Sequence, residues 1–207
     1  MSDPAHTLTS LDALEALYGR PDQRSVVKET RELTAPYRAF VEAAPFAVLA
    51  TRGPEGLDCS PRGDGPGFVR VADSRTLLLP DRRGNNRIDS LRNILADPAV
   101  ALLFMIPGIG ETLRVNGTGR ISVDPDLIAA CAVQARAPRS VLVIRVEAVF
   151  FQCSRAVVRA DLWNPAARVP RAAVPTAGTM LAAASGNHHG GAAYDADLAD
   201  RVRATLY

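Results

Sequence analysis

The chain has 207 residues, of which 24 are basic and 22 acidic, so its formal net charge at pH 7 is only +2. This length suits one well-cored domain with extensions or two small domains, and the balanced charge argues against a surface adapted throughout to nucleic acid. Lys28 is the only lysine. Arginine is therefore the default cation, and an arginine cluster needs support from its position before it indicates an anion site.

Residues 1–44 predict a helical extension in which we find no catalytic motif. Ser10 is a suitable N-cap for a first helix, whose apolar stripe comprises Leu11, Leu14, Leu17 and Tyr18. Further helices are expected over residues 26–33 and 36–43. The opening residues lack the basic and apolar regions of a signal peptide, and no segment reaches the ~20 apolar residues that span a bilayer, so we expect a cytoplasmic protein without membrane contact.

From residue 45 the pattern changes to strands joined by turns. Apolar or alternating runs predict strands over residues 46–51, 57–62, 68–71, 77–79, 99–106, 111–122 and 140–151. The first four have no helix between them, which disfavours a parallel sheet. Six or so strands of this kind predict a mainly β fold with flanking helices (α+β), arranged as a closed or nearly closed antiparallel barrel. We assign it residues 45–165, and we expect residues 166–207 to pack on the barrel or on a dimer partner.

The stretch Leu77–Leu95, LLLPDRRGNNRIDSLRNIL, contains the strongest candidate site. An apolar strand ends at Pro80, residues 81–86 form a polar turn, and a helix is expected from Arg87. Unpaired amides at a helix start, the helix dipole and bidentate arginine donors together suit a phosphate. The alternative is a solvated turn before an amphipathic helix.

Two alternating strands on either side of this turn each present a polar face. These faces comprise Asp58, Ser60 and Arg62 in one strand and Thr112, Arg114 and Asn116 in the other. The glycines at positions 63, 65 and 67 form GxGxG and open no helix, so they are not a dinucleotide fingerprint.

The positions of the histidines and cysteines in the sequence argue against several kinds of catalytic or metal site. No histidine occurs between His6 and His188, which disfavours a histidine triad, a histidine metal site or histidine-ligated haem in the core. Cys59, Cys131 and Cys153 lack the spacing of a zinc site or a disulfide framework. We therefore expect no metal.

The order of these segments resembles the FMN-binding split barrel of pyridoxamine 5′-phosphate oxidase-like proteins, over roughly residues 10–165. The segments that carry it are PFAVLAT, LDCSPRGD, LLLPDRRGNNRIDSLRNILADPAVALLF and ETLRVNGTGRI. With FFQCSRAVVRADLWNP, they resemble a branch of FMN-dependent enzymes of unassigned substrate. The resemblance implies a six-stranded antiparallel split β-barrel and a homodimer with FMN at the interface.

The resemblance also implies which residues contact the flavin. In the turn it implies phosphate contacts from Arg82, Arg83, Asn85, Asn86 and Arg87. Ser60 and Arg62 would face the phosphate or ribityl chain. Thr112 and Arg114 would lie against the isoalloxazine, and Arg155 and Trp163 would come from the second subunit.

The activity implied is that of an FMN-dependent oxidoreductase acting on an unidentified small molecule. The final residues lack the Arg-x-His motif of the true oxidases, which argues against pyridoxamine phosphate as substrate. Asp58 and Glu111 are the only acid or base candidates, so no catalytic residue is assigned. Alternatives are a non-catalytic flavin-binding or sensor protein, a deazaflavin F420 or haem barrel, and, ranked last, a nucleic-acid binder.

Overall fold

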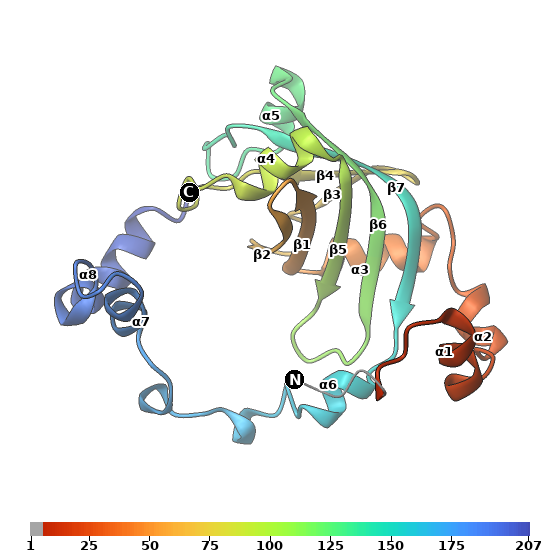
Figure 1. Ribbon diagram of the computed structural model, residues 1–207. Helices are drawn as coiled ribbons and strands as arrows, with labels where there is room; N and C mark the ends of the chain where they lie inside the picture. Colours follow the sequence, from red (N-terminus) through yellow and green to blue (C-terminus); the bar gives the residue numbers. More distant parts are fainter. Residues whose placement is uncertain (1–5) are drawn as a thin grey trace.

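The computed structural model describes residues 6–207 (Figure 1), and its strands form one seven-stranded antiparallel sheet in the order β2-β1-β5-β6-β7-β4-β3. The strands are β1 Phe46–Gly53, β2 Gly56–Gly63, β3 Arg70–Asp73, β4 Thr76–Pro80, β5 Ala99–Met105, β6 Thr112–Ser122 and β7 Val141–Gln152. The mainly antiparallel fold with flanking helices is confirmed, but the expected strand count of six is wrong. The seventh is the short edge strand β3, which overlaps the strand expected over residues 68–71 and which the six-stranded barrel implied by the resemblance leaves out.

The central strands have continuous apolar sequences because both of their faces are at least partly covered. In β1, the side chains of Ala47, Leu49 and Thr51 are buried, and those between them are half-buried. The same alternation in β5 buries Val100, Leu102 and Phe104. One face of the sheet therefore forms the main core, and the opposite, outer face is less covered.

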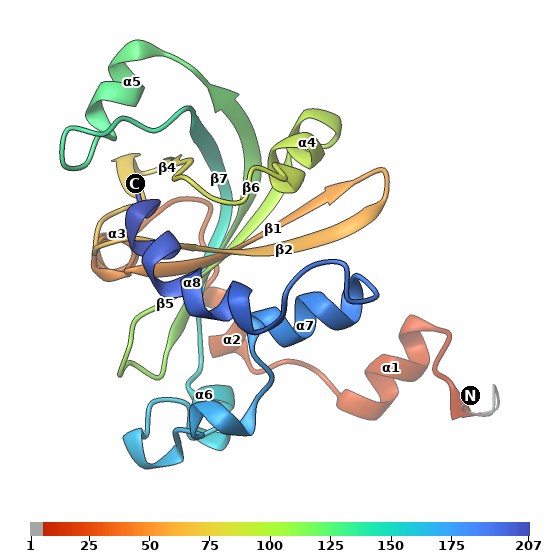
Figure 2. The same ribbon diagram turned by 90° about the vertical axis from the view of Figure 1, so that its left-hand side faces the viewer.

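Two helices cover the core side of the sheet. The helix α3 (Ala35–Ala43) begins at its N-cap Thr34 and buries Val41, while α4 (Asp89–Ala96) buries Ser90 and Ile94 against the sheet. A smaller apolar cluster lies beside α5 (Pro125–Ala130) and includes Cys131. The contacts of α4 with the sheet hold this helix over one end of it, beside β1 and β2 (Figure 2).

Three predicted helix boundaries are wrong. The second helix is α2 (Gln23–Val27) rather than residues 26–33, because Thr30 exchanges two main-chain hydrogen bonds with Val149 of β7 and makes this segment extended. The helix α4 begins two residues late because Ile88 is left-handed. The helix α5 ends at Ala130 rather than near Gln134, which is itself left-handed.

The terminal segments pack loosely on the sheet. No residue of α1 (Leu11–Tyr18) is buried, and its Tyr18 is 76% exposed. Beyond α6 (Arg155–Arg159) the chain forms η2 (Pro165–Ala167), η3 (Arg171–Ala173), α7 (Ala177–Ala184) and α8 (Gly191–Ala204). We call residues 166–207 the C-terminal strap. It loops away from the sheet (Figure 1) and returns to it beside the turn that follows β4, and Gly178 is its only buried residue.

Candidate functional site: an arginine-lined cavity

The polar face of β2 points toward the inside of the protein. In the register with β1, Arg62 lies opposite Ala47, Ser60 opposite Leu49 and Asp58 opposite Thr51. Partners directly opposite in an antiparallel pair share a face, so these three polar residues lie on the core side of the sheet. The alternate apolar positions face outward, and Leu57 is 87% exposed. The β2 polar face therefore meets the start of α4 rather than bulk solvent.

A hydrogen-bonded network joins β2 to the first turn of α4. The Ser90 hydroxyl donates to Asp58 Oδ2 over 2.7 Å and accepts from Arg62 Nη2 over 3.1 Å. The Ser60 hydroxyl also donates to Asp58, with its Oγ 3.2 Å from Oδ2. These bonds hold the pKa of Asp58 below its ordinary value, with the Ser90 bond as the largest cause. Arg62 is thereby fixed with its guanidinium at the N-terminus of α4.

The turn between β4 and α4 has an unusual backbone. Asn86 and Ile88 have φ angles of 64° and 54°, in the left-handed region, which a β-branched residue such as Ile88 rarely adopts. Ile88 is also the N-cap of α4 and supplies no side-chain hydrogen bond to the helix. The first amides of α4 consequently lack a side-chain cap and are available to an anion.

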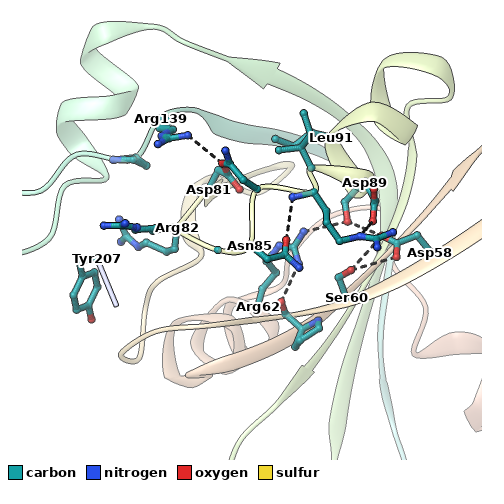
Figure 3. A pocket seen from close by; sticks show the side chains of 18 of the residues that line it. Asp58, Ser60, Arg62, Asp81, Arg82, Asn85, Asp89, Leu91, Arg139 and Tyr207 are labelled. Atoms are coloured by element: carbon teal, nitrogen blue, oxygen red, sulfur yellow. Dashed lines mark hydrogen bonds and ion pairs between the residues drawn. The ribbon is translucent and has the colours of Figure 1, made fainter. Parts of the chain in front are cut away.

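A cavity of about 790 Å³ lies at this turn (Figure 3). Its walls come from β2, the turn, the start of α4 and the loop between α5 and β7. Its lining includes six arginines, which are Arg62, Arg82, Arg83, Arg87, Arg136 and Arg139. The acidic residues in the lining are Asp58, Asp81 and Asp89. The cavity is therefore rich in cations from separate segments of the chain.

The six arginines differ in whether their guanidinium groups are already paired with neighbouring residues. Arg82 donates to Asp64 over 2.8 Å and to the Cys131 carbonyl over 2.9 Å, and this ion pair is largely buried. Arg87 is paired with Asp89 over 2.7 Å but is exposed. Among residues 6–207, Arg83 has no hydrogen-bond or ion-pair partner. Arg82 thus has a structural role, whereas Arg83 and Arg87 can reorient toward a ligand.

Burial perturbs two charged groups that line the cavity. It lowers the pKa of the half-buried Arg62, an effect opposed by Asp81 and Asp58. It raises the pKa of Asp81, against the opposing effects of Arg62 and Arg139. Figure 3 shows Asp81 between these two arginines. An anion that replaced water here would favour the charged form of Arg62.

Arg136 and Arg139 were not among the predicted site residues. They reach the cavity because Pro80 of β4 pairs with Val141 of β7, which brings together the loops that follow one strand and precede the other. The Asp81 amide donates to the Ser140 carbonyl over 3.0 Å, and Arg139 donates to Asn86 over 3.1 Å. The sequence signal was the pair of arginines in RAPR, just before a predicted strand, but the pairing of that strand was not predicted.

Comparison with known proteins supports a family assignment. The family model described as pyridoxamine 5′-phosphate oxidase matches residues 33–153, more than half of the chain. The chain belongs to the pyridoxamine 5′-phosphate oxidase family. No curated protein matches it.

Three solved structures are examples of what this chain is similar to. HupZ of Group A Streptococcus is 21% identical over 59% of this chain and 95% of its own, with a TM-score of 0.48. An F420 reductase is 23% identical over 56% and 98%, with a TM-score of 0.42. A Clostridium acetobutylicum protein of the pyridoxinephosphate oxidase family, related to general stress protein 26, is 12% identical over 56% and 84%, with a TM-score of 0.43.

Within the family fold, the predicted site residues fall into two groups. The first lines the cavity and comprises Ser60, Arg62, Arg82, Arg83, Asn85, Asn86 and Arg87. The second lies on the outer face, because Thr112 and Arg114 alternate with the core residues Leu113 and Val115 of β6. The two polar faces expected to flank one ligand therefore lie on opposite sides of the sheet within one protomer.

The second group is held together at the hairpin between β5 and β6. The Gln152 amide oxygen faces Arg114 and accepts from its guanidinium over 2.8 Å, and the amide nitrogen lies 3.4 Å from the Thr112 hydroxyl and donates to it. Trp163 donates to the Ile109 carbonyl over 2.7 Å, which fixes the segment after α6 beside the same hairpin. Arg155 begins α6 and Arg159 ends it, four positions further along the chain.

None of the helices formed by residues 6–207 is long and apolar enough to cross a membrane.

Proposed function

We propose that this protein is a cytoplasmic homodimeric flavoprotein whose sheet forms a split barrel, and that it is an FMN-dependent oxidoreductase acting on a small molecule. The observation that carries the proposal is the convergence of Arg62, the arginine turn and the uncapped start of α4 on one cavity. Membership of the pyridoxamine 5′-phosphate oxidase family supports it.

The donor set of this cavity fits a phosphate group. Main-chain amides of α4 supply hydrogen bonds and a favourable dipole, and Arg62 supplies a partly desolvated cation. Arg83 and Arg87 are exposed on the turn and add flexible bidentate donors. The phosphate of FMN would lie here, with Ser60, Asn85 and Asn86 at its margin.

The flavin ring would lie between two copies of the chain. Thr112 and Arg114 cannot reach the cavity of their own protomer because they lie on the outer face of the sheet. A second copy packed on that side would bring its Thr112, Arg114, Arg155 and Trp163 to the first copy's cavity. The two-fold repeat of this contact gives two equivalent sites per dimer.

When bound, FMN supplies hydride transfer at its N5 atom. The residues of this chain bind and orient it. Arg114 or Thr112 would stabilise negative charge on the pyrimidine side of the reduced ring, and Trp163 would shield one edge from water. Asp58 is held by Ser90 and Ser60, and its lowered pKa makes it an acceptor rather than a general acid at neutral pH.

The direct test is the absorption spectrum of the protein as purified, with the released chromophore identified by mass. The proposal predicts a yellow protein that releases FMN. A colourless protein that gains no thermal stability from added FMN would refute it. Steady-state reduction by NADH or NADPH, followed in air, separates an oxidoreductase from a flavin-binding sensor.

One observation supports a second candidate cofactor, the deazaflavin F420. Arg136 and Arg139 extend the cationic lining beyond the turn, where the longer anionic tail of F420 would need partners. The same spectrum and mass distinguish this cofactor from FMN.

A further inference from the structure

One wall of the cavity comes from the far end of the sequence. Tyr207 lines the cavity together with the arginine turn, although 120 positions separate it from Arg87. Figure 3 shows its ring on the same side of the cavity as Arg82. The segment that brings it there, the C-terminal strap, has almost no buried residues. The position of Tyr207 therefore depends on its own contacts rather than on packing of the strap.

Those contacts connect Tyr207 to three loops of the site. Its hydroxyl donates to Asp64 Oδ1 over 2.7 Å, while Asp64 Oδ2 accepts from Arg82 over 2.8 Å. Arg82 continues to the Cys131 carbonyl, and Arg136 donates to the main-chain oxygen of Tyr207 over 2.8 Å. The result is a ring of contacts that links the end of β2, the arginine turn and the loop between α5 and β7.

No comparable set of contacts holds the rest of the strap. Among the described residues, and apart from bonds to the residues just before it, the strap is tied to the rest of the protein by the two hydrogen bonds of Tyr207. Its helices α7 and α8 pack on each other, with Asp195 accepting from Thr176 and from the Gly178 amide. The strap is thus a helical hairpin whose hydrogen bonds to the rest of the protein, beyond the residues just before it, come from one residue at the cavity wall.

We propose that Tyr207 is a ligand-positioning residue, and that occupation of the cavity by an anionic ligand and docking of the strap stabilise each other. Docking holds Asp64, Arg82 and Arg136 in their observed arrangement and so shapes the turn that carries Arg83 and Arg87. A ligand anion in turn draws the arginines of both loops together and favours the docked position of Tyr207. The proposal rests on the anion-binding part of the proposed function and is independent of the flavin.

Because of thermodynamic linkage, this coupling can be measured either as a change in ligand affinity or as a change in docking of the strap. The factor by which docking raises ligand affinity equals the factor by which the ligand favours docking. A merely structural Tyr207 would lower thermal stability but would not make the exposure of α8 depend on ligand. Two measurements on the full chain separate these possibilities.

The first measurement is the affinity for inorganic phosphate and for FMN, by titration calorimetry. Tyr207→Ala removes the ring that lines the cavity together with the hydroxyl bond to Asp64, and Tyr207→Phe removes only that bond. The matched control is Tyr194→Ala, because Tyr194 lies in α8, stacks on Arg201 and does not line the cavity. We expect Tyr207→Ala to weaken phosphate binding by roughly fivefold or more, Tyr207→Phe by less, and Tyr194→Ala not at all.

The second measurement is hydrogen exchange in α8 with and without saturating phosphate. Phosphate should slow exchange in the unmodified protein and in Tyr194→Ala, and much less in Tyr207→Ala, which keeps only the main-chain bond to Arg136. Equal exchange with and without phosphate in the unmodified protein, or undiminished affinity in Tyr207→Ala, would overturn the inference, as would a failure of phosphate to bind. If phosphate shows the coupling and FMN does not bind, the inference stands and the flavin proposal fails.

Discussion

At the scale of single residues, the site shows that a shared cavity does not imply a shared role. Arg82 and Arg83 are neighbours in sequence, yet Arg82 is held by Asp64 and a main-chain carbonyl while Arg83 is exposed. The sequence could identify the arginines of the turn but could not rank them, because Asp64 and Cys131 come from distant segments. Ligand binding should depend on Arg83 and Arg87, and local stability on Arg82.

The first prediction concerns these two exposed arginines. Arg83→Ala combined with Arg87→Ala should weaken FMN binding roughly 100-fold, because each lost bond to a charged group is worth about 1.5 kcal/mol. The circular dichroism spectrum should be unchanged. The control is Arg24→Ala with Arg38→Ala, since both arginines are paired with nearby carboxylates outside the cavity. Unchanged FMN affinity in the first variant would mean that the phosphate lies elsewhere.

The second prediction concerns Asp81. Burial raises its pKa in the folded protein, so the folded state binds this proton more tightly than the unfolded state. The contribution of Asp81 to the stability of the protein therefore falls as pH rises from about 4, the ordinary range of an aspartate, through the raised pKa. Asp81→Asn removes this cost. It should resist urea better than the unmodified protein at pH 7 and equally well below about pH 4.

A variant Asp81→Asn less stable than the unmodified protein at pH 7 would show that Arg62 and Arg139 stabilise the carboxylate more than burial destabilises it. The same substitution removes a negative charge from the cavity wall. The affinity of the Asp81→Asn variant for inorganic phosphate at pH 7 should therefore be higher than that of the unmodified protein.

At the scale of elements, the strands were predictable because their patterns are local. The alternation in β2 and β6 and the apolar runs in β1 and β5 all mark strands in the structure. The pairing of β4 with β7 is not local, and it alone brings Arg136 and Arg139 to the turn. Likewise, the bridge from Thr30 to Val149 overrides a local helical pattern. Local signals therefore located the turn, and long-range pairing completed the site.

The third prediction concerns the bend in β6. The register with β7 shifts at Gly117, where an added Cβ would collide with the main-chain oxygen of Arg145. Gly117→Ala should lower the free energy of unfolding by about 3 kcal/mol, because main-chain atoms cannot move aside cheaply. Gly84→Ala is the control, since Gly84 has open space around its Cβ position. Equal denaturant midpoints for the two variants would contradict the role of the bend.

At the scale of the whole molecule, the two groups of predicted residues require a second copy if both contact one ligand. The cavity lies on the core side of β2, and Arg114 lies on the outer side of β6. The sequence predicts the two groups together because alternation shows which residues share one face of a strand. It does not show whether the polar faces of two distant strands lie on the same side of the sheet. The sheet order supplies that relation.

The fourth prediction tests sharing between subunits. Arg62→Ala and Arg114→Ala should each weaken FMN binding as homodimers. In a heterodimer of the two, one site carries both substitutions and the other carries neither. Co-expressed with different tags and purified as a heterodimer, the pair should bind one FMN per dimer with the affinity of the unmodified protein. Weak binding at both sites would place the two residues in the same protomer's site.

The central claim is that the arginine cavity holds the phosphate of a flavin, and the most direct test compares FMN with riboflavin. The two ligands share the same ring and differ only in the phosphate. Titration of the ligand-free protein should give a dissociation constant for FMN roughly 100-fold below that for riboflavin, and the Arg83→Ala/Arg87→Ala variant should lose this difference by weakening FMN alone. Equal affinity for FMN and riboflavin, or binding of neither, would contradict the account.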